Sequence, residues 1–219
     1  MKRFYVVLGL AALAGGAWLT YQARRPPAAG PGGAVVPLPA TDGFPGYTMG
    51  SDSAPVEVVE YADFECPACA QFAAVQMPTV REQLIATGRV RWRFRDFPLP
   101  THSFARYAAH AAQCAGEQSR FWDMHDQLFA NHSWAQTGRD PSRLFRDMAR
   151  TVGLDLDRYD ACMESARYAG RIEASKQEGD ARGVNGTPTF FINGRQLTAR
   201  SWGSDVFKGV VDSITGRGR

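Results

Sequence analysis

The alternation of apolar and polar positions between residues 56 and 97 predicts two strands with a helix between them. Residues 56–61 form a short, largely apolar run rich in valine, which is typical of a buried central strand. After Cys66 the apolar positions recur with a helical period, and Pro78 is expected to kink or split that helix. Gly88 ends the helix, and cations then alternate with apolar residues over residues 89–97, which predicts a second, half-buried strand.

Residues 101–182 have a helical pattern throughout, and their apolar stripes predict four helices, around residues 104–115, 121–129, 144–148 and 156–166. A strand pattern returns at residues 189–193. Asn193-Gly194 is typical of a hairpin turn, and residues 202–214 predict a closing helix. The order β-α-β, helical block, β-β-α indicates an α/β domain, residues 47–100 and 183–219, that is interrupted by an all-helical insertion, residues 101–182.

The N-terminal residues show neither a strand nor an amphipathic helix pattern, but one long uncharged run. Residues 4–21 carry no charge, and Lys2-Arg3 and Arg24-Arg25 flank them. As a helix this run would be roughly 27 Å long, close to the ~30 Å hydrocarbon core of a bilayer. Residues 1–23 are therefore expected to be a membrane anchor or a cleaved signal peptide, and both place the rest of the chain outside the cytoplasm. Residues 24–46, rich in Pro, Gly and Ala, are expected to be a linker.

Composition limits the possible partners. The chain has 219 residues, 44% of them hydrophobic, which is enough for one core with an inserted subdomain. Its formal net charge is +3, but the first 41 residues hold four cations and no acid, so the remainder is close to neutral. This balance gives no electrostatic basis for binding nucleic acid.

The most informative motif is Cys66-Pro67-Ala68-Cys69, which directly follows the first predicted strand and opens the helix. Disulfide exchange needs a thiolate that attacks and a second thiol that resolves the mixed disulfide. The positive end of a helix dipole lowers the pKa of a cysteine at its first turn, and Pro67 suits a first helical position. We therefore expect Cys66 to be the nucleophile and Cys69 the shielded, resolving thiol.

An acidic residue is expected beneath this pair. Alternation along the first strand points Glu60 inward, six residues before Cys66. A buried carboxylate there would move protons to and from Cys69. The alternative is a partly solvated strand acid with no role in the chemistry.

Three segments resemble the DsbA-like thiol:disulfide oxidoreductases: residues 58–69 around the paired cysteines, residues 121–129, and residues 183–194 around Gly186-Thr187-Pro188. The resemblance covers roughly residues 47–215 and implies a thioredoxin-like fold with an inserted helical domain. It also implies that Thr187-Pro188 is a cis peptide facing the Cys66–Cys69 bond, where the Thr187 backbone would pair with a substrate strand. Glu60 matches the buried acid of the family. The chain departs from the best-known member of the family at two places that bear on the direction of electron flow. Pro67-Ala68 lacks the His found between the cysteines of that member, and Thr187 rather than Val precedes the proline, a pattern also seen in disulfide isomerases and reductases.

The remaining cysteines, Cys114 and Cys162, lie on buried-type faces of two predicted helices. A structural disulfide between them is the main prediction; two buried free thiols or a second redox-active pair are the alternatives. Their spacing of 48 residues matches no zinc motif, so neither a metal nor a cofactor is expected. Of the scattered histidines, His125 is expected to be a hydrogen-bonded core residue. His102 precedes the insertion and could approach the active site.

The sequence thus predicts an extracytoplasmic oxidoreductase that introduces disulfides into translocated proteins. It would be located in a bacterial periplasm or on the outer face of the cytoplasmic membrane. Expected partners are thiol- or disulfide-containing extracytoplasmic proteins and, from the resemblance, a membrane redox partner that re-oxidises Cys66 and Cys69. The protein is expected to be monomeric. A reductase or isomerase of the same fold is the alternative, and a tethered metal-binding or chaperone-like module is a third.

Overall fold

The computed structural model describes residues 43–199 and 201–216. The predicted N-terminal segment, residues 1–23, and most of the predicted linker lie outside them. Among the residues described, no helix has the length and apolar character needed to cross a bilayer.

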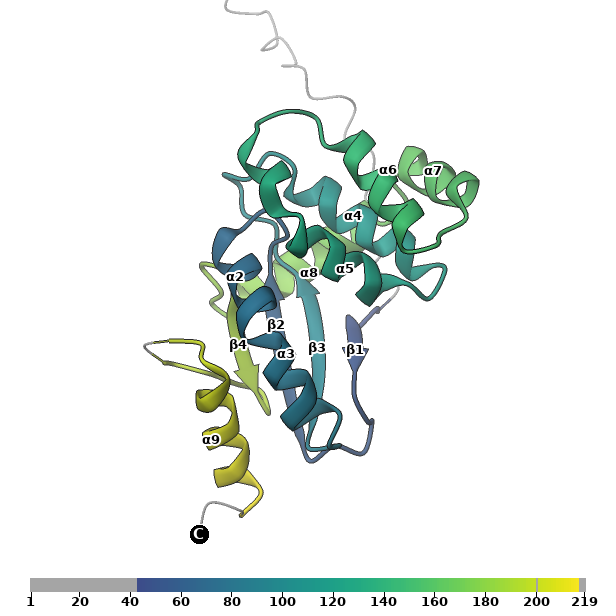
Figure 1. Cartoon of the computed structure of the whole chain (residues 1–219). Coiled ribbons are helices and arrows are strands. Elements are labelled where there is room, and N and C mark those ends of the chain that lie inside the picture. Colours follow the sequence, from purple (N-terminus) through teal and green to yellow (C-terminus); the bar gives the residue numbers. More distant parts are fainter. Residues whose placement is uncertain (1–42, 200, 217–219) are drawn as a thin grey trace, which may run out of the picture. The chain divides into compact units, whose positions relative to one another are not determined.

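A five-stranded mixed sheet forms the centre of the fold, in the order β1-β3-β2-β4-β5 (Figure 1). The strands are β1 (Tyr47–Met49), β2 (Val56–Ala62), β3 (Val90–Asp96), β4 (Thr189–Ile192) and β5 (Arg195–Gln196). Strands β2 and β3 pair in parallel, and the other neighbours are antiparallel. The predicted hairpin at Asn193-Gly194 is confirmed, and both residues have positive φ, which suits a tight two-residue turn.

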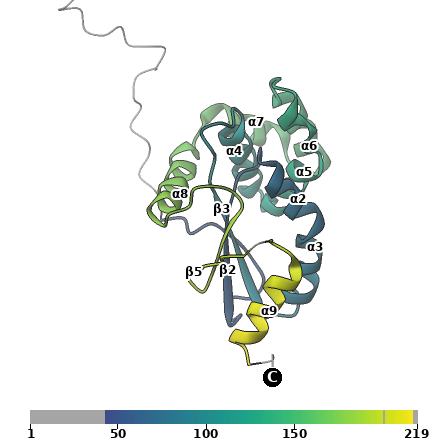
Figure 2. The ribbon, with the colours of Figure 1, turned by 90° about the vertical axis from the view of Figure 1, so that its left-hand side faces the viewer.

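Helices cover both faces of this sheet. On one face, α2 (Pro67–Val75), α3 (Met77–Val80) and α9 (Ser204–Ile214) enclose a cluster that includes Val58, Trp92 and Phe190. On the opposite face lies α8 (Ala169–Ala181), as Figure 2 shows. The helix after Cys66 does break near Pro78: α2 ends at Val75, and a π-helical turn, Arg81–Ile85, follows α3.

The segment between β3 and β4 is helical, with α4 (Ala105–Gly116), α5 (Phe121–Ala130), a 3-10 turn (His132–Gln136), α6 (Ser142–Thr151), α7 (Leu156–Ser165) and α8. The expectation of four helices here was wrong, because the chain reverses at Ala166, with φ 48°, and α8 then begins as a separate helix. The residues of α8 are small or polar on most sides, so they show no apolar stripe.

Close packing against the sheet explains why α8 needs so small a residue at its contact point. A Cβ atom added at Gly179 would lie 2.6 Å from the ring of Phe97 and 3.1 Å from that of Tyr61. The α/β fold class predicted from the sequence, a thioredoxin-like sheet interrupted by helices, is confirmed by this arrangement.

Candidate active site

The paired cysteines lie where β2 passes into α2. Cys66 is the N-cap residue of α2, with φ −76° and ψ 122°, and Pro67 is the first helical residue. The N–H of Cys66 donates to the carbonyl oxygen of Asp63 at 3.1 Å, which closes the loop between strand and helix. The sulfur of Cys66 is thereby held at the end of the helix that carries unpaired N–H groups and positive partial charge.

The two sulfurs differ in environment. Both thiols are free; Cys69 is completely buried, and Cys66 is 6% exposed. The pKa of Cys66 is lowered to about 5, chiefly by a hydrogen bond from the Cys69 thiol, and further by the Thr187 side chain and by backbone N–H groups of Cys69 and Ala68. Burial acts against this shift. The pKa of Cys69 is raised well above its ordinary value, first by burial and then by its neighbour Cys66. At pH 7 the pair therefore holds one thiolate, on Cys66, and one thiol.

The segment before β4 faces this thiolate. The Thr187–Pro188 peptide bond is cis, as the family resemblance implied. The carbonyl oxygen of Thr187 lies 3.3 Å from Sγ of Cys66, across a sequence separation of 121 residues. The structure thus brings together the two motifs that the sequence singled out.

Glu60 lies within the core, 2% exposed, on the face of the sheet that α2 covers. Its Oε2 accepts a hydrogen bond from Nε1 of Trp92 at 2.9 Å, and burial raises its pKa to about 7. Its charge also contributes to the raised pKa of Cys69, which places the two groups within electrostatic reach. The carboxyl is therefore buried and not partly solvated, and its role in proton transfer stays a prediction.

A second carboxylate, that of Asp63, lies beside the site although no sequence pattern predicted it, and its side chain is fully buried. Its Oδ1 accepts from the N–H of Glu65 at 2.7 Å, and its Oδ2 accepts from the N–H of Leu99 at 2.8 Å. Nδ1 of His102 lies 2.7 Å from the same Oδ2. The sequence did offer one sign of this role: Asp63 is an acidic residue in the short segment between a buried strand and the Cys-x-x-Cys motif.

The two residues that follow Asp63 are also held from the helical segment. Nε2 of His132 lies 3.1 Å from the carbonyl oxygen of Phe64, and the N–H of Phe104 donates to Oε2 of Glu65 at 2.6 Å. Together with His102, these groups contact three consecutive residues immediately before Cys66. The active-site loop is thus fixed from outside the sheet domain.

Cys114 and Cys162 are joined by a disulfide, with an S–S length of 2.03 Å and Cα atoms 5.7 Å apart. Both are fully buried and connect α4 to α7. Within the described ranges, these sulfurs and His110 form a cluster of metal-type ligands, but sulfurs in a disulfide offer no thiolate to an ion. His125 is a buried core residue, as predicted, with Nδ1 2.8 Å from Oδ1 of Asp126.

The two central residues of the Cys-x-x-Cys motif are exposed, although both cysteines are buried. Pro67 and Ala68 are exposed, and a cavity of about 430 Å³ opens beside Ala68, between α2 and residues 201–203. Phe72 and Trp202 contribute its aromatic lining.

This fold and this pair of thiols define a thiol–disulfide oxidoreductase. A family model described as thioredoxin matches residues 45–212, so the chain belongs to the thioredoxin family. Among solved structures, it is similar to BdbD from Bacillus subtilis, with a TM-score of 0.68 and 24% identity, covering 77% of this chain and 92% of that one. It is similar also to alpha-DsbA1 of Wolbachia pipientis, with a TM-score of 0.68, 23% identity, and coverage of 84% and 94%. The predicted resemblance to DsbA-like proteins is thereby confirmed at the level of the fold.

By sequence, the chain is similar to proteins with two different descriptions, Na⁺/H⁺ antiporters and a disulfide bond formation protein. The chain is 45% identical over 151 residues to a Na⁺/H⁺ antiporter, NhaA 3 of Salinispora tropica, covering 68% of this chain and 22% of the antiporter. It is 25% identical over 150 residues to a probable disulfide bond formation protein D of Bacillus anthracis, covering 67% of this chain and 69% of that protein. The chain therefore spans about a fifth of the length of the antiporter relatives it matches.

Proposed function

We propose that this protein introduces disulfides into extracytoplasmic proteins, with Cys66 as nucleophile and Cys69 as resolving thiol. The observation that carries the proposal is the asymmetry of the pair. Cys66 is the N-cap residue of α2, lies beside the Thr187 carbonyl and has a pKa of about 5, while Cys69 is buried and protonated. Thr187 and Pro188 form the surface against which the client backbone pairs.

The exchange has two steps. A client thiolate attacks Sγ of Cys66 in the oxidised Cys66–Cys69 pair; the protein disulfide breaks, a mixed disulfide forms, and Cys69 leaves as a thiolate that takes up a proton. A second client thiolate then attacks the client sulfur of the mixed disulfide, and Cys66 leaves as a thiolate. The client loses two electrons and two protons. The protein gains both electrons and keeps one proton, on Cys69, while the other proton passes to solvent.

The low pKa of Cys66 supports this direction of electron flow. A thiolate stabilised in the reduced protein makes the disulfide form a stronger oxidant, and a thiol of low pKa is also the better leaving group. Glu60 lies within electrostatic reach of Cys69 and has a pKa of about 7, which suits it to deliver and accept the proton of Cys69 near neutral pH.

The proposed location follows from the sequence outside the described residues. An uncharged run with cations before it favours an anchor or signal peptide, and hence a periplasmic or outer-face location. Recycling then requires a membrane redox partner that removes two electrons from Cys66 and Cys69. The cavity beside Ala68, whose lining combines Phe72 and Trp202 with polar side chains, offers a surface on which such a partner or a client can dock.

Trapping tests the roles of the two cysteines. In a Cys69→Ala variant, mixed disulfides through Cys66 should accumulate in cells and disappear on reduction. The matched Cys66→Ala variant should trap none. If Cys66→Ala traps clients as efficiently, the assignment of nucleophile and resolving thiol is wrong.

The equilibrium of the pair with glutathione tests the direction. We expect a reduction potential above about −200 mV, as for disulfide-introducing enzymes, whereas a reductase would lie near about −270 mV. The lower value would replace the proposal with the reductase alternative. Stoichiometric metal in protein purified without chelator, together with no exchange activity, would favour the third alternative, a metal-binding module.

A further inference from the structure

Glu65, the residue immediately before the proposed nucleophile, is fixed both at its backbone and at its side chain. Its backbone N–H donates to Oδ1 of Asp63 at 2.7 Å, and its Oε2 accepts from the N–H of Phe104 at 2.6 Å. The next residue, Cys66, donates its own N–H to the carbonyl oxygen of Asp63. The peptide that joins Glu65 to Cys66 is therefore held on both sides.

The group that holds the Glu65 side chain is the start of a helix. Phe104 is the N-cap residue of α4, and its carbonyl oxygen accepts from the N–H of Ala108 at 2.8 Å. The side chain of Phe104 offers no acceptor, and the first turn of α4 holds no acidic residue. Unpaired N–H groups and the positive end of the helix dipole at such a terminus favour a carboxylate. Glu65 supplies it from outside the helix, through a charge-assisted hydrogen bond.

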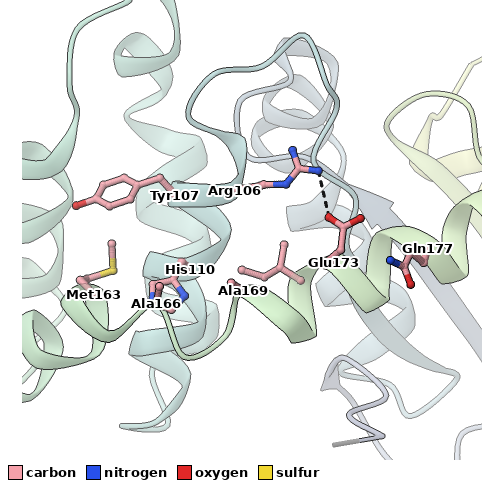
Figure 3. Close-up of a pocket in the computed structure, with 9 residues that line it drawn as sticks. Arg106, Tyr107, His110, Met163, Ala166, Ala169, Glu173 and Gln177 are labelled. Atoms are coloured by element: carbon pink, nitrogen blue, oxygen red, sulfur yellow. Dashed lines mark hydrogen bonds and ion pairs between the residues drawn. The ribbon is translucent and has the colours of Figure 1, made fainter. Parts of the chain in front are cut away.

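The cation in the first turn of α4 is engaged elsewhere. Arg106 forms an ion pair with Glu173 of α8 at 3.2 Å, seen as the dashed line in Figure 3. Over the described ranges, 43–199 and 201–216, the Glu65 side chain contacts the N–H of Phe104 and no cationic side chain. The start of α4 thus has two separate connections, one through Arg106 to α8 and one through Phe104 to the active-site loop.

The place of the Cys66 sulfur matters because the groups that stabilise its thiolate are themselves fixed. A hydrogen bond from the Cys69 thiol lowers the pKa of Cys66 most, and backbone N–H groups of Cys69 and Ala68, at the start of α2, lower it further. Hydrogen bonds weaken steeply as their geometry departs from the optimum. A contact that holds the backbone of Cys66 therefore also maintains the stabilisation of its thiolate.

We propose that Glu65 is a positioning residue for the exchange reaction: by anchoring the active-site loop to the N-terminus of α4, it holds the Cys66 sulfur beside the N–H groups at the start of α2. This inference rests on the proposed role of Cys66 as nucleophile, and it makes the helical insertion a determinant of thiol reactivity. Without the anchor, the sulfur is held less firmly beside those N–H groups, so the thiolate of the reduced protein is less stable and the protein disulfide is favoured.

Two substitutions of similar size separate the anchor from the charge. Glu65→Gln removes the charge and keeps an oxygen that accepts from Phe104, whereas Glu65→Met removes both. Because the two variants have the same net charge, the difference between them measures the anchor alone. We expect the acid dissociation constant of the Cys66 thiol to be about threefold to tenfold lower in Glu65→Met than in Glu65→Gln. The glutathione equilibrium should shift by a similar factor towards the protein disulfide.

Both quantities are measured in the full chain, the first from thiolate absorbance against pH. Glu65→Ala removes the acceptor by truncation and should show the same shift as Glu65→Met. Glu173→Gln is the matched control, because it breaks the other connection of the first turn of α4 and leaves the loop contact in place. It should leave both quantities unchanged.

The inference is overturned if neither Glu65→Met nor Glu65→Ala differs from Glu65→Gln. It is also overturned if Glu173→Gln produces an equal shift, because the effect would then come from a general loosening of α4. A different result would contradict the proposed function itself: a Cys66 thiol that ionises like free cysteine in the unmodified protein. The two failures are thus distinguishable.

Discussion

Nδ1 of His102 lies 2.7 Å from Oδ2 of Asp63, three residues before Cys66 in sequence. Asp63 is fully buried, whereas the His102 side chain is 21% exposed. The backbone of Asp63 contacts both cysteines: its carbonyl accepts from the N–H of Cys66, and its own N–H donates to the sulfur of Cys69. This one carboxylate thus links the active-site loop to the segment that leads into the helical insertion.

Replacing His102 should alter the redox balance of the pair. In a His102→Ala variant, the buried carboxylate of Asp63 loses a donor, so its negative charge is less compensated and the pKa of Cys66 should rise. The reduced form is then less stable, and the equilibrium with glutathione should shift towards the protein disulfide by about threefold to tenfold. Absorbance of the thiolate at different pH values and the glutathione equilibrium measure the two quantities.

The control for this prediction is His132→Ala. His132 contacts the same loop, at the carbonyl oxygen of Phe64, and not the carboxylate of Asp63. If both variants shift the equilibrium equally, the effect comes from the rigidity of the loop and not from the charge of Asp63.

Glu60→Gln should slow the step in which Cys69 loses its proton. Above pH 7 the Glu60 carboxyl is ionised and can accept that proton, so the rate of resolution should rise with pH through about 7. The variant keeps an acceptor for Trp92, cannot take up a proton, and should be about a hundredfold slower at pH 7.5. Stopped-flow measurement of the reduced protein with a disulfide-containing peptide between pH 5 and 9 gives the profile, because Cys69 then loses its proton as it resolves the mixed disulfide on Cys66. An unchanged profile in the variant would exclude a proton-transfer role.

The raised pKa of the Glu60 carboxyl also predicts how the stability of the protein depends on pH. Its pKa in the folded protein, about 7, lies above its ordinary value of 4.5, so the folded state binds the proton more tightly than the unfolded state. Stability should therefore decrease as pH rises from about 4.5 to 7, by up to about 3 kcal/mol. Urea unfolding of Glu60→Gln should lack this decrease; if its slope with pH equals that of the unmodified protein, another group is responsible.

Removing the second cysteine pair should affect stability and not chemistry. The Cys114–Cys162 bond has a sequence separation of 48 residues. In the chain-entropy model, removing a cross-link that closes a loop of this length lowers the free energy of unfolding by about 4 kcal/mol. The double variant Cys114→Ala/Cys162→Ala should unfold at lower urea concentration, with unchanged exchange activity per folded molecule. A fall in that activity would instead indicate that the second pair takes part in electron transfer.

Two glycines in helices should respond oppositely to alanine. Gly179→Ala brings a methyl group within 2.6 Å of Phe97, so the contact between α8 and the sheet must open, and we expect a loss of about 1–3 kcal/mol. Gly209 in α9 has no atom within 4 Å of an added Cβ, so Gly209→Ala should stabilise by about 0.5–1 kcal/mol through helix propensity. Thermal unfolding of both variants provides the comparison, and equal effects would contradict the packing argument.

The sequence by itself determined the strands around the active site, the position of Cys66 at the start of a helix and the inward direction of Glu60. These features are local: they depend on period-two or period-3.6 patterns and on the helix signals of proline and glycine within a few residues. The three motifs that resemble DsbA-like proteins placed Thr187 and Pro188 in the same site. That step rested on the family, since no local pattern brings residues 121 positions apart together.

Only the tertiary structure decided which groups hold the active-site loop and which contacts shift the pKa values of the two thiols. Asp63 and His102 are 39 residues apart, and neither lies in a pattern that predicts the other. The separate helix α8 has no apolar stripe, because three of its four buried residues, Gly170, Ser175 and Gly179, are small. Gly179 lets the helix lie close to the sheet. The pKa values of Cys66 and Cys69 follow from burial and from hydrogen bonds across the fold. Such long-range contacts depend on how whole elements pack, and residue periodicity carries no information about them.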